Sequence, residues 1–289
     1  MARKAGSRTL TAPEVRARKG GAPLVVVTAY DAPGARIADE AGVDMILVGD
    51  SVAMVVLGHD DTLAVTVPDM AHHVAAVARA RPTPMVVADL PWLSYHVSPG
   101  DTVVNAGTLV RAGAQAVKLE GGRKRLPMIE ALVDAEIPVM GHLGLTPQSV
   151  HAMGGYRVQG RDAGGASELL DDARALAQSG CFAIVLEGVP DRLARRVTEA
   201  VPVPTIGIGA GRWCDGQVLV FHDLLGLEDR IVPRFVRRYA SLKAEAVDAV
   251  SAFADDVRNG RFPSEDESYP LSDDVARALG LDDPSSRSA

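Results

Sequence analysis

The stretch PMVVADL, residues 84–90, is a short apolar run that begins at a proline and ends just past an aspartate. Val86, Val87 and Ala88 follow one another without polar alternation, which is typical of a strand buried on both faces, as in a parallel sheet. Runs of the same kind recur along the chain at residues 23–30, 45–50, 116–121, 138–144, 182–188, 204–211 and, in shorter form, 218–223. The sequence therefore predicts seven or eight buried strands.

Helical patterns separate these runs. They cover residues 32–42, 68–80, 98–114, 166–180 and 190–201, and the patterns at 98–114 and 166–180 are followed or closed by glycine, as helix C-termini often are. Regular alternation of strands and helices predicts an α/β fold, and the strand count favours a closed (β/α)₈ barrel. A doubly wound open sheet is the alternative that the pattern leaves open.

The chain is expected to form one barrel domain over residues 1–262, which includes further helices at 236–260. Residues 263–289 then form a C-terminal extension. Its last eight residues, DDPSSRSA, are polar and are predicted to be disordered.

Composition limits the classes of partner. The 289 residues carry a net charge of −7, which argues against nucleic acid as the main partner because phosphate neutralisation needs a basic surface. No apolar run approaches the roughly 20 residues of a membrane helix, so no membrane partner is expected. The two cysteines, Cys181 and Cys214, lie in no metal-binding or redox motif and are expected to be reduced thiols. These features predict a cytoplasmic protein.

Ionisable residues gather where the predicted strands end. In (β/α)₈ barrels the chemistry lies at the carboxyl ends of the strands, so these side chains should meet at one rim. Each of them alone also has a structural explanation as a turn residue, a helix cap or a buried ion pair. Five consecutive strands supply the set, which consists of Asp50, Asp89, Lys118 with Glu120, His142 and Glu187.

The composition of this set favours metal-assisted chemistry on a small acid. Asp50, Asp89 and Glu120 offer hard oxygen ligands without a Cys/His cluster, which favours Mg²⁺ over Zn²⁺. Mg²⁺ leaves coordination positions for a 2-oxo acid, whose carbonyl it polarises. Lys118 supplies positive charge for an enolate, and Glu187 is placed to remove the proton beside the carbonyl.

The chain resembles the ketopantoate hydroxymethyltransferase family. The resemblance covers about residues 8 to 270 and is carried by the motifs LVGDS (47–51), KLEGG (118–122), GHLGLTPQSV (141–150) and GGYRVQGR (154–161). It implies a TIM barrel of the phosphoenolpyruvate/pyruvate type and transfer of a one-carbon unit from 5,10-methylenetetrahydrofolate to 3-methyl-2-oxobutanoate. The product would be 2-dehydropantoate (ketopantoate), in pantothenate and coenzyme A biosynthesis, with Mg²⁺ as cofactor. It also implies a homo-oligomer, with a homodecamer as the expected assembly.

The same resemblance assigns roles to single residues. It implies a metal site of Asp50, Asp89 and Glu120. It implies an oxo-acid site of Asp50, Ser51, Asp89 and Lys118, with His142 as a further site residue, and Glu187 as the proton acceptor. Two other functions stay open from the residues: a Mg²⁺-dependent 2-oxo-acid C–C lyase or mutase of the related barrels, and a non-catalytic scaffold.

Overall fold

The computed structural model describes residues 9–230 and 233–281, and the predicted disorder of residues 282–289 lies outside them. By its internal contacts the chain divides into two compact units, Met1–Ala240 and Ser241–Ala289. The boundary of the predicted single domain at residue 262 stays a prediction. Among the helices of the described residues, none is long and apolar enough to span a membrane.

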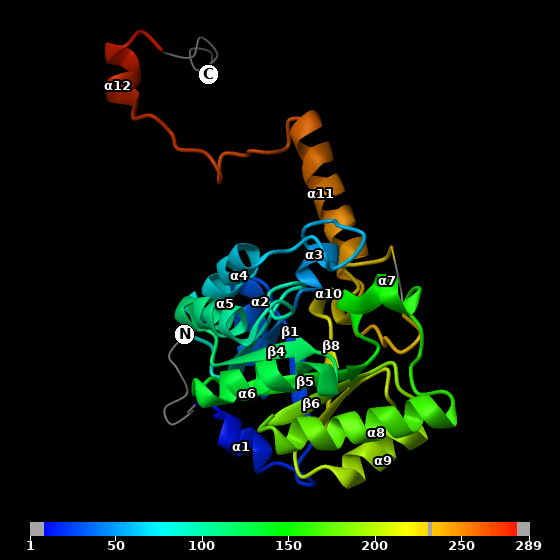
Figure 1. Ribbon diagram of the computed structural model, residues 1–289. Helices are drawn as coiled ribbons and strands as arrows, with labels where there is room; N and C mark the ends of the chain where they lie inside the picture. The colour runs from blue at the N-terminus through cyan, green and yellow to red at the C-terminus, as the bar shows by residue number, and fades with distance from the viewer. Residues whose placement is uncertain (1–8, 231–232, 282–289) are drawn as a thin grey trace. The chain divides into compact units, whose positions relative to one another are not determined.

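The first unit is a closed barrel of eight parallel strands in sequence order (Figure 1). The prediction of a (β/α)₈ barrel is confirmed, and the doubly wound alternative is wrong because β1 pairs with β8 and closes the sheet. The strands are β1 Leu24–Thr28, β2 Met45–Val48, β3 Met85–Asp89, β4 Ala116–Glu120, β5 Val139–Gly144, β6 Ala183–Glu187, β7 Thr205–Ile208 and β8 Gly216–Leu219.

Helices lie in the connections between the strands, before β1 and after β8. Those of the first unit are α1 Ala12–Arg16, α2 Ala32–Glu40, α3 Val52–Val55, α4 Val67–Arg79, α5 Pro99–Ala112, α6 Leu126–Asp134, α7 Val150–Met153, α8 Ala163–Gln178, α9 Asp191–Ala200 and α10 Phe221–Leu225. Two short 3₁₀ turns cover Arg123–Arg125 and Pro147–Ser149. The second unit contains α11 Leu242–Arg258 and α12 Asp273–Ala278.

The predicted eighth strand is wrong in its position. It was expected at residues 218–223, but β8 is Gly216–Leu219, and Phe221 already begins α10. The strand opens with Gly216, where an added Cβ would lie 2.5 Å from the Leu24 carbonyl oxygen, and continues with the polar Gln217. Because β8 packs closely against β1, it begins with a glycine and a polar residue. A search for continuous apolar residues therefore does not find its first half.

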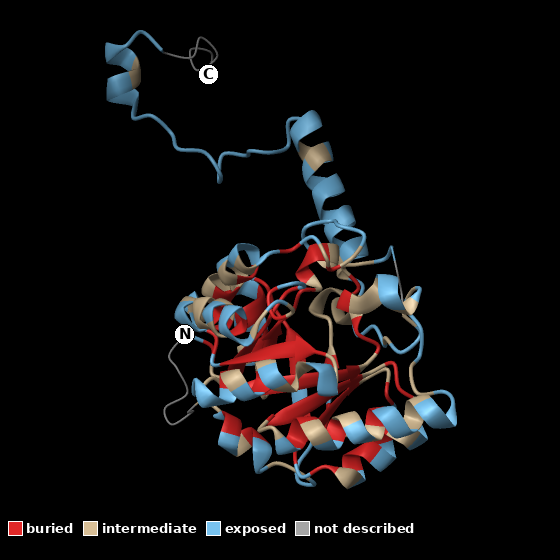
Figure 2. Ribbon diagram, in the orientation of Figure 1, coloured by how far each residue is buried: buried red, intermediate tan, exposed pale blue. Residues whose placement is uncertain are grey.

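The barrel strands are buried (Figure 2), and their side chains form two core layers that alternate along a strand. Met45 and Leu47 point into the barrel, whereas Ile46 and Val48 pack under the surrounding helices, as the two-residue period of a strand requires. The apolar residues of α1, Ala12 and Val15, join the inner layer. The inner layer is therefore apolar, and α1 extends it.

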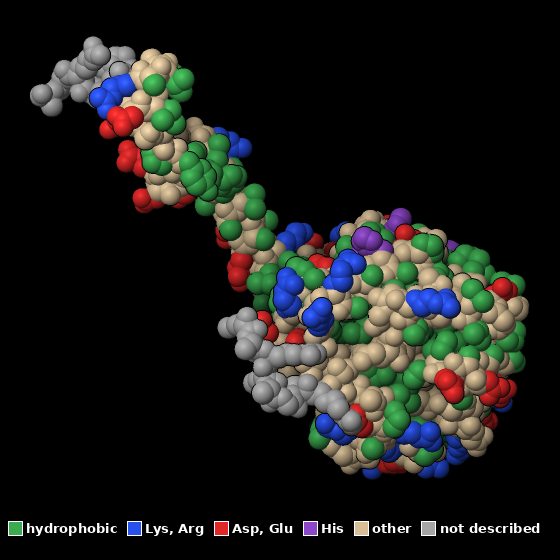
Figure 3. All heavy atoms as spheres, turned by 90° about the vertical axis from the view of Figure 1, so that its left-hand side faces the viewer, with side chains coloured by type: hydrophobic (Ala, Val, Ile, Leu, Met, Phe, Trp, Pro, Cys, Tyr) green, Lys and Arg blue, Asp and Glu red, His purple; other side chains and the backbone are tan. Residues whose placement is uncertain are grey.

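On the face that Figure 3 presents, acidic and basic side chains are interspersed with polar and apolar ones.

Candidate active site

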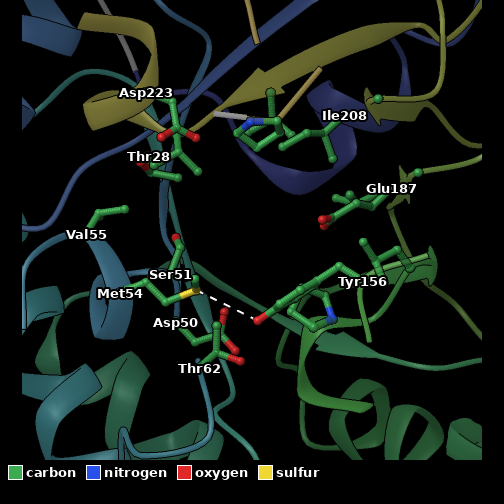
Figure 4. A pocket seen from close by; sticks show the side chains of 18 of the residues that line it. Thr28, Asp50, Ser51, Met54, Val55, Thr62, Tyr156, Glu187, Ile208 and Asp223 are labelled. Atoms are coloured by element: carbon green, nitrogen blue, oxygen red, sulfur yellow. Dashed lines mark hydrogen bonds between the residues drawn. The ribbon is translucent and has the colours of Figure 1, made fainter. Parts of the chain in front are cut away.

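A cavity of about 680 Å³ opens at the carboxyl ends of the strands. All seven residues predicted for the site line it: Asp50, Ser51, Asp89, Lys118, Glu120, His142 and Glu187. Figure 4 shows Asp50, Ser51 and Glu187 around this space, together with Tyr156 and Asp223. The sequence-based expectation that these side chains meet at one rim is therefore consistent with the structure.

Strand period and register explain why they meet. On β4, Lys118 and Glu120 follow Ala116 at intervals of two and so share its inward face. The parallel register pairs Asp89 with Lys118 and Glu120 with His142 on neighbouring strands. The polar layer thus lies directly above the apolar interior of the barrel.

Lys118 joins the two sides of this layer. Its Nζ lies 3.0 Å from Asp89 Oδ1 and 3.1 Å from His142 Nδ1, and all three side chains are buried. Burial alone would lower the pKa of Lys118, but the charges of Asp89, Glu120 and Asp50 outweigh it and raise the pKa above its ordinary value. Lys118 is therefore a permanent cation at the floor of the cavity.

His142 lies between two carboxylates. Its Nδ1 is 3.4 Å from Glu120 Oε1, and its Nε2 is 3.3 Å from Glu187 Oε2. Burial and the charge of Lys118 lower the pKa of His142, yet Glu120 and Glu187 outweigh them and raise it to about 9. His142 therefore lies within ion-pair distance of both carboxylates, although its buried Nε2 forms no hydrogen bond with any residue that the structure describes.

Asp50 and Asp89 lie side by side. The backbone N–H of Asp50 donates to Asp89 Oδ2 over 3.1 Å, and both side chains are buried. Burial, followed by the charges of Asp89 and Glu120, raises the pKa of Asp50 well above its usual range. Gly49 leaves room for the Ser51 hydroxyl beside these carboxylates, because an added Cβ would lie 2.8 Å from Ser51 Oγ. Ser51 in turn shares a 2.9 Å hydrogen bond with the hydroxyl of Tyr30.

Gln148 connects the carboxylates and was not singled out from the sequence. Its Nε2 donates to Asp50 Oδ2 (2.8 Å) and to the Leu90 carbonyl (2.9 Å), while its backbone N–H donates to Glu120 Oε2 (3.0 Å). Its Oε1 accepts from the Tyr95 hydroxyl over 2.6 Å. The available signal was its position in the loop after β5, within the motif GHLGLTPQSV.

The donor set fits a divalent cation in part. Two buried, adjacent carboxylates with surplus negative charge, Asp50 and Asp89, are the hard oxygen ligands that Mg²⁺ takes. Glu120 is turned toward His142 and the Gln148 backbone. Within residues 9–230 and 233–281, no group of three or more His, Cys, Asp or Glu side chains is arranged to hold a metal. The three-carboxylate ligand set therefore stays a prediction.

A family model described as ketopantoate hydroxymethyltransferase matches residues 9–265. The chain belongs to the ketopantoate hydroxymethyltransferase family. It is 53% identical over 278 residues to 3-methyl-2-oxobutanoate hydroxymethyltransferase of Oleidesulfovibrio alaskensis, covering 96% of each chain. It is 56% identical over 262 residues to the enzyme of the same name from Moorella thermoacetica, covering 90% of this chain and 97% of that one.

Solved structures support the fold of this ketopantoate hydroxymethyltransferase family member. The chain superposes on 2,3-dimethylmalate lyase, a member of the PEP mutase/isocitrate lyase superfamily, with a TM-score of 0.59. The match covers 94% of this chain and 99% of that one at 19% sequence identity. The likeness supports the predicted TIM barrel. At this identity the likeness speaks for the fold alone, whereas the hydroxymethyltransferase relatives share more than half of their residues.

Proposed function

We propose that this enzyme transfers a hydroxymethyl group from 5,10-methylenetetrahydrofolate to 3-methyl-2-oxobutanoate, which gives 2-dehydropantoate. Membership of the family and the names of its relatives support the reaction. The observation that carries the mechanism is the convergence of Lys118, His142 and Glu187 with the paired carboxylates Asp50 and Asp89 in one cavity. Such a site combines a base, a cation and ligands for a metal.

Glu187 is the proposed base. It accepts the proton from C3 of the oxo acid, and the electrons of that C–H bond form the enolate. Lys118 places its charge beside the developing negative charge, and His142 holds the Glu187 carboxylate in position. The C–N10 bond of the methylene bridge opens as the proton taken up by Glu187 passes to N10, and the enolate carbon attacks the methylene carbon that N5 still holds. Water then replaces N5 at that carbon: its hydroxyl stays on the carbon, its proton goes to N5, and tetrahydrofolate leaves.

Asp50 and Asp89 would hold Mg²⁺, with Glu120 as the third carboxylate of the proposed set. Bound Mg²⁺ supplies positive charge that polarises the keto group of the substrate. The hydrogen bonds from Gln148 to Asp50 (2.8 Å) and to Glu120 (3.0 Å) hold both carboxylates in fixed positions. Ser51 is the proposed neutral contact to the oxo acid, because its hydroxyl lines the same floor.

The deciding experiment measures 2-dehydropantoate formation from the two substrates with and without Mg²⁺. The Glu187→Gln variant should lose exchange of the C3 proton with solvent deuterium, while still binding the oxo acid. Exchange at the wild-type rate in that variant would remove Glu187 from the role of base.

Thermal melting tests the metal site separately. Mg²⁺ should raise the melting temperature of the wild type and not that of Asp89→Asn.

We further propose that the enzyme works in the cytoplasm as a homo-oligomer, with a homodecamer as the expected assembly. Membership of the ketopantoate hydroxymethyltransferase family is the ground for this expectation. Light scattering coupled to size-exclusion chromatography measures the mass directly. A mass near 30.3 kDa, that of one chain, would contradict the proposal.

A further inference from the structure

The cavity is larger than the oxo acid requires. Its volume of about 680 Å³ falls within the roughly 300–1,000 Å³ of sites that hold drug-sized ligands. The residues that act on the oxo acid occupy its floor, at the ends of β2 to β6. Further parts of the wall come from α3 and the loop after it, from the loop after α7, from α10 and from residues 228–235 that the structure describes. The mechanism above gives these parts no role.

Asp223 is an unused carboxyl group in that wall. It lies on α10, lines the cavity and is drawn beside Thr28 in Figure 4. Among the described residues no side chain or backbone group is hydrogen-bonded to its carboxylate, although the residue is partly buried. Burial and the nearby charge of Glu228 raise its pKa to about 6, so it is ionised at pH 8. The charge of Arg238 opposes this rise in the pKa, but Arg238 Nη2 donates to the Glu228 carbonyl over 2.8 Å and not to Asp223. A carboxylate that accepts no hydrogen bond suits a ligand that presents N–H groups.

Two arginines of the same wall are also unused. Arg157, Arg230 and Arg234 all line the cavity, but Arg230 is bound to Glu228, with Nη2 3.1 Å from Oε2. The guanidinium groups of Arg157 and Arg234 form no hydrogen bond or ion pair with any residue that the structure describes, and both side chains are exposed. Unpaired guanidinium groups at a cavity suit a carboxylate-bearing ligand, which they bind through paired N–H donors.

These groups have the charges that a folate needs. The pterin ring presents adjacent N–H donors on its pyrimidine edge, and the glutamate tail presents carboxylates at the other end. We propose that Asp223 binds the pterin edge of the folate co-substrate and that Arg157 and Arg234 bind its glutamate carboxylates. Phe235, which packs on Gly209 in the same wall, adds apolar area for the rings between these ends. This inference rests on the proposed function, because that function brings a folate to the cavity.

The test compares a folate with and without its tail. Calorimetry measures the dissociation constants of tetrahydrofolate and of 6-methyltetrahydropterin, which has the pterin and carries no carboxylate, at pH 8. The Arg157→Gln/Arg234→Gln variant should weaken tetrahydrofolate binding about tenfold or more, as expected for lost charge-assisted hydrogen bonds, and 6-methyltetrahydropterin binding less than twofold. Asp223→Asn keeps the shape of the side chain and should weaken both ligands about equally, since both carry the pterin. Arg237→Gln, an exposed neighbour that does not line the cavity, is the matched control.

The outcomes separate the inference from the function on which it rests. Equal losses for both ligands in the double arginine variant, or none, would overturn the tail site. Unchanged binding in Asp223→Asn would overturn the pterin site, and wild-type protein that binds neither ligand would overturn both. The proposed function is judged separately by product formation in the wild type: an enzyme that forms 2-dehydropantoate while the variants bind as the wild type does leaves the function standing and removes this inference.

Discussion

Lys118 Nζ lies 3.0 Å from Asp89 Oδ1 across the register pair that joins β3 and β4. Both side chains are buried, so the pair sits where charges are costly unless they compensate one another. Asp50 and Glu120 add two further carboxylates to the same layer. The stability of the barrel floor without metal therefore depends on Lys118 more than on any single carboxylate.

The Lys118→Met variant, which keeps the length of the side chain, tests this dependence. Removal of the cation leaves three buried carboxylates facing one another, and we expect the free energy of unfolding to fall by about 3–5 kcal/mol. Urea unfolding at pH 7 in the presence of a chelator measures it. Lys19→Met serves as a control, because Lys19 pairs with Asp215 away from the cavity in a partly exposed site. A Lys118→Met variant as stable as the wild type would contradict the argument.

The Asp50→Asn variant should act in the opposite direction. Burial and the charges of Asp89 and Glu120 raise the pKa of Asp50, which means that its ionised form is disfavoured in the folded protein. The amide keeps an oxygen that can accept from Gln148, so we expect a gain of about 1 kcal/mol in unfolding free energy together with loss of catalysis. The same urea titration, paired with the product assay, measures both. A loss of stability would show that the Asp50 charge is well compensated.

The barrel could be predicted from the sequence because strands buried on both faces consist of nearly continuous apolar residues. Seven apolar runs fall on β1 to β7 within a few residues, since each strand interior must be apolar toward the barrel and toward the helices. The position of the eighth strand was predicted wrongly because it begins with Gly216 and Gln217, which are not apolar and pack closely against β1. Close backbone approach, unlike burial, leaves no hydrophobic signal.

The site was predictable where strand period fixes it. Lys118 and Glu120 are two residues apart on one strand, so their common face follows from the sequence alone. Gln148 was missed because its function depends on a loop that folds back to Asp50, 98 residues away in the chain. The orientation of Glu120 toward His142 likewise depends on register between strands, which residue types do not encode.

Gln148→Glu examines the residue that joins the carboxylates. The substitution replaces the N–H donor 2.8 Å from Asp50 Oδ2 with a carboxylate, which adds repulsion in a buried site. We expect kcat/KM at pH 8 to fall tenfold or more, equivalent to about 1.4 kcal/mol or more of transition-state stabilisation. Gln178→Glu makes the same change at an exposed end of α8 and should leave the rate unchanged. Equal rates in the two variants would remove Gln148 from the site.

Gly144 is required by a backbone contact beside the proposed base. Its φ is +93°, and an added Cβ would lie 2.2 Å from the Glu187 carbonyl oxygen and 2.6 Å from Val189 Cγ2. We expect Gly144→Ala to destabilise the fold by about 3 kcal/mol or more and to displace Glu187, because the clash is with backbone. Gly154→Ala is the control: its φ is +67° with nothing within 4 Å of the added Cβ, so it should cost only about 1–2 kcal/mol. Denaturant unfolding measures the free energy of unfolding of both variants. The difference between them separates the cost of the steric clash from the cost of a positive φ.

The two free cysteines should differ in reactivity. Burial raises the pKa of Cys181 to about 12, and burial also raises the pKa of Cys214, which is less enclosed. Since the thiolate is the reactive form, an aromatic disulfide reagent at pH 8 should modify Cys214 slowly and Cys181 only after unfolding. Raising the pH from 7 to 9 should accelerate the first reaction and leave the second undetectable, because Cys181 stays a thiol over that range. Cys214→Ser assigns the signal: fast modification in this variant under native conditions would show that the helix α8 side of the barrel opens to solvent at Cys181.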